Sequence, residues 1–148
     1  MSLHQNLAAD IKAAMLARDA DRLGTLRLLK SALGYLAIEQ KTDLVPDADF
    51  ISVVQKEVKK RRDSIEQFEK GGRPELAAKE KAELAVLEAY LPKALSPEEL
   101  EALVKACIQE AGATSKKDMG QVIRAVQAKA AGRAEGKLIS QLVGKLLS

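Results

Sequence analysis

A group of basic residues near the C-terminus has the composition best suited to binding chemistry in this 148-residue sequence. Residues 115–148 hold seven Lys and Arg against two Asp and Glu, whereas residues 1–92 hold fifteen of each kind. The basic residues are Lys116, Lys117, Arg124, Lys129, Arg133, Lys137 and Lys145. Concentrated positive charge favours a polyanionic partner, although lysines that only solvate an outer face would give the same count.

The chemistry that these side chains could perform is phosphate binding. Lys and Arg bind phosphate oxygens, and Gln121, Gln127 and Gln141 could reach sugar or base edges. Aromatic residues make up only 3% of the chain, so base stacking is not expected to dominate. This combination predicts recognition of the shape and backbone of a folded RNA, with no DNA partner expected. So few charges predict weak, salt-sensitive binding.

Few residues are suited to nucleophilic or metal chemistry. His4 is the only histidine, in a terminus expected to fray, and Cys107 is the only cysteine. Zinc sites and Ser-His-Asp or Cys-His arrangements therefore lack partners. Cys107 shares a helical face with Leu100 and Val104, which indicates a small core residue. No glycine-rich nucleotide loop occurs, and no carboxylate pair stands out as a general acid and base. The residues predict no catalytic site, no metal and no cofactor.

The elements that position the basic residues are expected to be helices. Residues 116–147 should form two short helices joined at residues 132–136, with Val122, Val126 and Leu142 on the inner side. At 100° per residue, Lys117 and Arg124 fall on the opposite face of the first helix. Lys137 likewise points away from the apolar side of the second helix. The expected result is a helical hairpin with a basic, polar outside.

The whole chain reads as all-α, with no strand pattern. We expect an N-terminal helical bundle of hairpins over residues 1–92 and a small three-helix C-terminal module over residues 96–148. Pro92 marks the boundary, and Ser96, Pro97 and Glu99 give the signature of a capping box at a helix start. Asp47 or Asp49 is expected to cap the long helix that ends near Lys70.

The second helix of the bundle carries an unusually wide apolar band. Leu26, Leu29 and Leu33 form its centre, and Leu28 and Tyr35 widen it. A band of this width predicts contact with two neighbours, as for the central helix of a bundle.

An ion-pair cluster is predicted inside the hairpin that turns at Gly71-Gly72. Folding about this turn places Arg61 opposite residues 80–83, so we expect Arg61 to contact Glu80, with Glu57 on the same guanidinium. The cluster is interpreted as structural. If the cluster is buried, loss of one member would strongly reduce the stability of the fold. If it lies at the rim of the core, the loss would be small.

Signals for membranes or secretion are missing from the sequence. No apolar run approaches the roughly 18 residues of a membrane span, so no membrane partner is expected. The first residues lack a basic region followed by an apolar block. The expected location is the cytoplasm.

Several segments taken together resemble the YqeY family. These are residues 59–64, 71–76, 88–92 and 132–136, together with Met119-Gly120. The resemblance implies an all-helical, two-domain protein whose C-terminal part is similar to the tail of GatB, the B subunit of tRNA-dependent amidotransferase. That enzyme amidates misacylated Glu-tRNA or Asp-tRNA with glutamine as nitrogen donor, and its tail contacts the outer body of the tRNA. The resemblance also implies the label of carbon–nitrogen ligase with glutamine as amido-N-donor.

The sequence therefore predicts an accessory protein of tRNA metabolism. It would bind tRNA through Lys117, Arg124, Arg133 and Lys137, which lie at motif positions and are expected to point away from the apolar side of their helices. A synthetase or an amidotransferase is a further possible partner. Two alternatives stay open: a protein–protein interaction adaptor with no direct nucleic-acid binding, and direct amidotransferase catalysis. The residues alone do not decide whether the chain is an enzyme.

Overall fold

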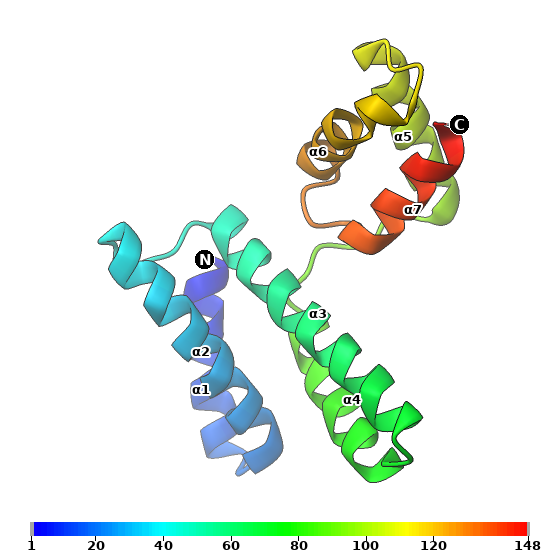
Figure 1. Ribbon diagram of the computed structural model, residues 1–148. Helices are drawn as coiled ribbons and strands as arrows, with labels where there is room; N and C mark the ends of the chain where they lie inside the picture. The colour runs from blue at the N-terminus through cyan, green and yellow to red at the C-terminus, as the bar shows by residue number, and fades with distance from the viewer. Residues whose placement is uncertain (1, 148) are drawn as a thin grey trace. The chain divides into compact units, whose positions relative to one another are not determined.

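The computed structural model describes residues 2–147, and within that range the chain is entirely helical apart from its connections (Figure 1). The all-α prediction is thus confirmed. Two compact units are present, residues 1–91 and residues 92–148. The elements are α1 (Leu3–Leu16), α2 (Ala20–Gln40), α3 (Asp47–Lys70), α4 (Pro74–Glu88), α5 (Pro97–Ala111), the 3-10 turn η1 (Lys116–Asp118), α6 (Met119–Ala130) and α7 (Gly136–Leu146). None of the described helices is both long and apolar enough to cross a membrane.

The N-terminal unit consists of α1 to α4. Helix α2 packs against α1, α3 and α4, while α3 and α4 run side by side as a long hairpin (Figure 1). The core of the unit is formed by Leu7, Leu26, Leu29, Leu33, Val45, Phe50, Val54, Val58 and Leu87. The expectation that this band contacts two neighbours is confirmed, because α2 packs against three helices. Leu28 and Tyr35, which widen the band, stay exposed.

Three of the α-helices, α1, α2 and α5, begin with a side-chain cap. Ser2 and Ser96 each form a capping box, and Asp19 accepts a hydrogen bond from the Arg22 N–H at the start of α2. Helix α3 begins after Pro46 without a side-chain cap. The prediction of an Asp47 or Asp49 cap is wrong, because both carboxylates accept hydrogen bonds from more distant partners. Asp47 accepts from the Leu3 N–H at 3.0 Å, and Asp49 accepts from the Gln40 side chain at 3.1 Å.

The N-terminal end of α1 is held by the loop between α2 and α3. The backbone N–H of Val45 donates to Nδ1 of His4 at 2.9 Å, and Val45 itself is buried. His4 therefore anchors the loop, and the expectation of a frayed terminus at this residue is wrong. No sequence signal pointed to this contact, because its two partners are 41 residues apart.

The C-terminal unit packs α5, α6 and α7 around one apolar core. Its buried residues are Leu100, Val104, Cys107, Val122, Val126, Ile139, Val143 and Leu147. Cys107 is 1% exposed, as expected for a core residue. Gly112 ends α5 with a φ of 63°, a left-handed conformation that glycine adopts without strain.

Candidate nucleic-acid interface

Three of the predicted RNA-binding residues project from the surface of the C-terminal unit. Lys117 lies in η1, Arg124 on α6 and Lys137 in the first turn of α7, and all three are exposed. Val122 and Val126 turn the opposite side of α6 into the core, which forces Arg124 outward. Within the described residues, none of the three cations forms an ion pair, so each is available to an external anion.

The α6–α7 hairpin spaces these cations along its length. A Cβ atom added to Gly136 would lie 3.6 Å from the Gln127 side chain, and one added to Gly144 would lie 3.4 Å from Met119. The two helices therefore run antiparallel, with Lys137 beside the last turns of α6. Lys117 precedes the first turn of α6. The 12 residues of α6 span about 18 Å, so these cations could meet several phosphates of one backbone rather than a single ion.

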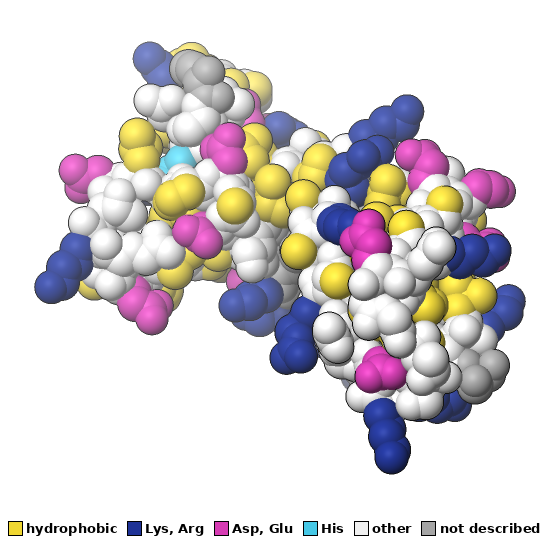
Figure 2. Space-filling model, turned by 90° about the horizontal axis from the view of Figure 1, so that it is seen from above, with side chains coloured by type: hydrophobic (Ala, Val, Ile, Leu, Met, Phe, Trp, Pro, Cys, Tyr) yellow, Lys and Arg dark blue, Asp and Glu magenta, His cyan; other side chains and the backbone are white. Residues whose placement is uncertain are grey.

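Two other lysines of this unit are engaged within the protein. Lys129 donates to Oε2 of Glu110 at 2.6 Å, and this hydrogen bond raises the pKa of the Lys129 ammonium. Lys105 pairs with Glu101 at 3.0 Å. On the face shown in Figure 2, Lys and Arg side chains are spread around the outline of the C-terminal unit, with Asp and Glu side chains between them. On this face, the positive charge is thus distributed rather than gathered in one dense patch.

Arg133 has a structural position that its sequence motif did not reveal. Its Nε donates to the carbonyl of Lys93 at 2.8 Å, and its own carbonyl accepts the Leu95 N–H at 2.8 Å. Its Nη2 lies 3.9 Å from Oε2 of Glu99. Arg133 therefore fastens residues 93–95 to the loop between α6 and α7. An RNA contact by the same side chain stays a prediction.

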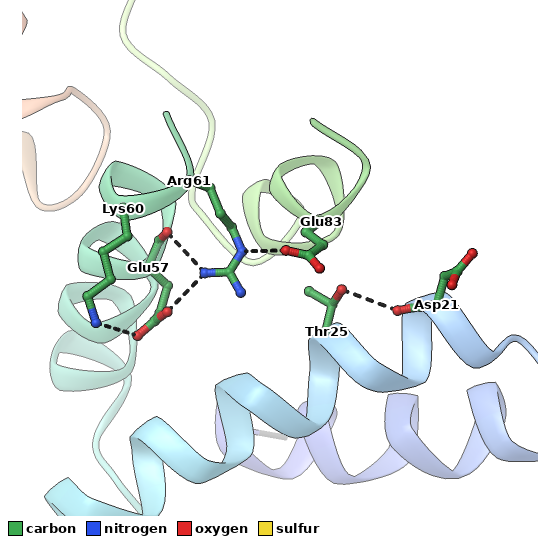
Figure 3. A network of polar contacts seen from close by, with 6 residues as sticks. All are labelled: Asp21, Thr25, Glu57, Lys60, Arg61 and Glu83. Carbon is green, nitrogen blue, oxygen red and sulfur yellow. Dashed lines mark hydrogen bonds and ion pairs between the residues drawn. The ribbon is translucent and has the colours of Figure 1, made fainter. Parts of the chain in front are cut away.

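The predicted ion-pair cluster forms around Arg61, with a different third member (Figure 3). Nη1 of Arg61 donates to Oε2 of Glu57 at 3.0 Å, and Nε lies 3.4 Å from Oε2 of Glu83. Lys60 also contacts Glu57, at 3.4 Å. Among the described residues, Glu80 makes no ion pair with Arg61, so the expected Arg61–Glu80 contact is wrong.

The register of the α3–α4 hairpin explains this difference. Arg61 and Glu83 are each eleven residues from Gly72 at the turn, so antiparallel packing brings them level. Glu80 is three residues nearer the turn, a displacement of about 4.5 Å along the helix. The cluster is largely buried, because the Arg61 side chain is only 9% exposed. Its position between α3 and α4 supports a structural role.

A second buried polar contact lies at the end of α4 and was not anticipated. The Tyr90 hydroxyl donates to Oδ2 of Asp10 at 2.5 Å, and its ring packs against Phe50 with centroids 5.6 Å apart. Burial, followed by the hydrogen bond to Asp10, raises the pKa of the Tyr90 phenol. This contact ties the last residues of the N-terminal unit to α1.

In the described part of the chain, no cluster of His, Cys, Asp and Glu could hold a metal ion.

Comparison with known proteins identifies relatives along nearly the whole chain. A family model described as Yqey-like protein matches residues 4–147. A protein of Pyrenophora tritici-repentis named "Altered inheritance of mitochondria protein 41, mitochondrial" is 30% identical over 93% of this chain and 79% of its own length. Proteins of the same name from Eremothecium gossypii and Kluyveromyces lactis are 35% and 38% identical over 74% and 66% of this chain. The matches cover 61% and 54% of those two proteins.

These names bear on the location of the protein. The expectation of a cytoplasmic protein rested on the lack of a signal at the N-terminus. The relatives are named as mitochondrial proteins, which contradicts that expectation. The sequence criterion failed because it tested for secretion and for membrane spans only.

Proposed function

This chain belongs to the YqeY-like protein family, and from that premise we propose that it is an accessory protein of tRNA metabolism. It binds tRNA, or a complex of tRNA with an enzyme, through the basic face of its C-terminal unit. Support comes from the family resemblance, which implies that this part is similar to the tRNA-contacting tail of an amidotransferase subunit. In this proposal, any link to glutamine-dependent amide formation is made through an amidotransferase partner.

One observation carries the proposal. Lys117, Arg124 and Lys137 lie along one helical hairpin without an ion pair among the described residues, whereas Lys105 and Lys129 are paired with carboxylates. Unpaired cations release counterions when they neutralise phosphates, so they supply binding free energy that paired cations do not. If three phosphates are contacted, raising the salt concentration from 50 to 200 mM should lower the affinity for tRNA about 40-fold.

Filter binding with bulk tRNA tests this function. We expect Arg124→Gln and Lys137→Gln each to weaken binding several-fold and to make its salt dependence less steep. The matched control is Lys105→Gln, which removes the same charge from the same unit at a residue already paired with Glu101. It should leave binding within about twofold of the unmodified protein.

Two results would contradict the proposal. Equal losses in Arg124→Gln and Lys105→Gln would mean that net charge, and not the hairpin face, determines binding. Binding that is insensitive to salt would exclude phosphate contacts. A protein partner retained on this face after nuclease treatment, without tRNA binding, would instead indicate a protein–protein adaptor.

A further inference from the structure

The start of α1 meets the region between α2 and α3 through two hydrogen bonds of different chemistry. The backbone N–H of Val45, in the loop of residues 41–46, donates to Nδ1 of His4 at 2.9 Å. The backbone N–H of Leu3 donates to Oδ1 of Asp47, the first residue of α3, at 3.0 Å. One acceptor is therefore an imidazole nitrogen, and the other is a carboxylate.

The first of these contacts depends on the protonation state of His4. A histidine nitrogen accepts a hydrogen bond only while it carries no proton, so the ring that accepts from Val45 is neutral. In the imidazolium form both ring nitrogens are donors. A proton added at Nδ1 would therefore set two donors against each other across 2.9 Å. A carboxylate, by contrast, accepts hydrogen bonds throughout the pH range in which histidine titrates.

The burial of Val45 determines how the loop must respond. His4 is only partly buried and borders a surface hollow of about 500 Å³, so its ring has room to turn outward. Val45 is 1% exposed and belongs to the core of the N-terminal unit. A buried backbone N–H without an acceptor is costly, and this one can reach water only if the loop moves. Protonation should therefore open the loop and not merely rotate the ring.

The charged groups around this junction are of both signs. Lys30 of α2, together with Lys41 and Asp43 of the loop, lines the same hollow as His4. On the side of α3, the charged group is Asp47, which holds the Leu3 N–H. Two cations oppose a charge on the ring and two carboxylates favour it. The hydrogen bond from Val45 is thus the interaction that separates the two protonation states most clearly.

We propose that His4 is a pH-sensitive latch for the loop that joins α2 to α3. The neutral ring holds residues 41–46 against α1, and protonation of the ring releases them. The sign follows from linkage: the open loop binds the proton and the latched loop does not, so the latch is closed above the titration range of histidine and opens as the pH falls through it. The contact between Leu3 and Asp47 persists, so the opening is local and α1 stays attached to α3.

Hydrogen exchange of single amides, measured by NMR on the full chain, tests this latch. Protection of the Val45 and Leu3 amides is compared at pH 7.5 and pH 5.5, each corrected for the intrinsic exchange rate at that pH. Val45 should lose protection about tenfold, because one pH unit below the usual range of histidine favours the proton-binding form by that factor. Leu3 should stay within about twofold, since its acceptor is a carboxylate. His4 is the only histidine in the sequence, so no second imidazole contributes.

Two substitutions separate the hydrogen bond from its titration. His4→Asn places an amide oxygen where Nδ1 lies and does not titrate, so Val45 should be protected equally at both pH values. His4→Ala removes the acceptor, so protection should be low at both. Unchanged protection of Val45 in the unmodified protein at pH 5.5 would overturn the proposal. A pH-dependent loss that persists in His4→Asn would overturn it as well, and an equal loss at Leu3 would refute a local opening.

Discussion

The Arg61 cluster gives the sharpest prediction about stability. In Arg61→Met, the apolar stem is retained while the guanidinium between Glu57 and Glu83 is lost. The side chains of Glu57 and Glu83 are 16% and 20% exposed. In the variant, Glu83 would lose its counter-charge and Glu57 would keep only its contact with Lys60. The N-terminal unit should therefore unfold at lower denaturant concentration, because two largely desolvated carboxylates lose their shared cation.

The size of the loss follows from the geometry. Removing one partner of a fully buried ion pair costs about 3–5 kcal/mol, whereas an exposed pair contributes less than about 1 kcal/mol. Both carboxylates keep part of their hydration here. Nε of Arg61 lies 3.4 Å from Glu83 but has no hydrogen-bond partner, so that contact is weaker than the Nη1 bond to Glu57. We therefore expect a loss of about 2–3 kcal/mol.

Tyrosine spectroscopy can measure this loss in the correct part of the chain. Both tyrosines, Tyr35 and Tyr90, lie in the N-terminal unit, and the sequence has no tryptophan. The tyrosine signal in urea therefore reports unfolding of that unit alone. The matched control is Arg62→Met, since Arg62 pairs with Glu88 at 2.6 Å but both side chains are more than one third exposed. Its expected cost is below about 1 kcal/mol.

A double-mutant cycle then decides between the two possible carboxylate partners. Arg61→Met combined with Glu83→Gln should show a coupling of about 1 kcal/mol or more, whereas the combination with Glu80→Gln should be additive within about 0.5 kcal/mol. Equal coupling to Glu80 and Glu83 would refute the register argument. Equal losses in Arg61→Met and Arg62→Met would refute the claim that burial makes this cluster important.

Three further predictions concern single contacts. Ser96→Ala should cost about 1 kcal/mol in the C-terminal unit. The hydrogen bond from the Ser96 backbone, followed by the contact with the Ser96 side chain, lowers the pKa of Glu99. NMR titration should therefore show a higher Glu99 pKa in Ser96→Ala. Because the pKa of Tyr90 is raised on folding, stability should fall as pH increases above about 10, the value in unfolded chains, and Tyr90→Phe should remove that part of the dependence. Arg133→Met should increase hydrogen exchange of the Leu95 amide, and Arg133→Lys should not restore protection, because an ammonium lacks the planar fork.

Sequence reasoning located the helices because their signals are local. The capping box of Ser96 and Glu99 needs residues only three positions apart, and the structure has it as predicted. The Asp47 cap failed for the opposite reason. A rule based on position makes Asp47 a cap, but its carboxylate accepts the Leu3 N–H from 44 residues away. A local pattern shows that a side chain is able to cap a helix, and tertiary contacts decide whether it does.

The same distinction applies to the apolar band of α2. Helical phase shows correctly that Leu28 and Tyr35 widen the band beyond its core-facing residues. It does not show which of these residues the neighbouring helices cover. Helices α1, α3 and α4 pack against α2, yet Leu28 and Tyr35 remain 55% and 78% exposed. The width of the band is thus a property of the sequence, while its coverage depends on where the fold places the neighbouring helices.

The choice of candidate RNA-binding residues depends on this argument as well. Phase places Arg124 and Lys137 outside the core, and the structure agrees. The position of a residue around its helix cannot predict that Lys129 is paired with a carboxylate 19 residues away. Nor can it predict that Arg133 donates to a carbonyl 40 residues away. A substitution of Arg133 that weakened RNA binding could therefore act by releasing residues 93–95. Substitutions of Lys117, Arg124 and Lys137 do not have this ambiguity, because none of the three has an ion pair to lose among the described residues.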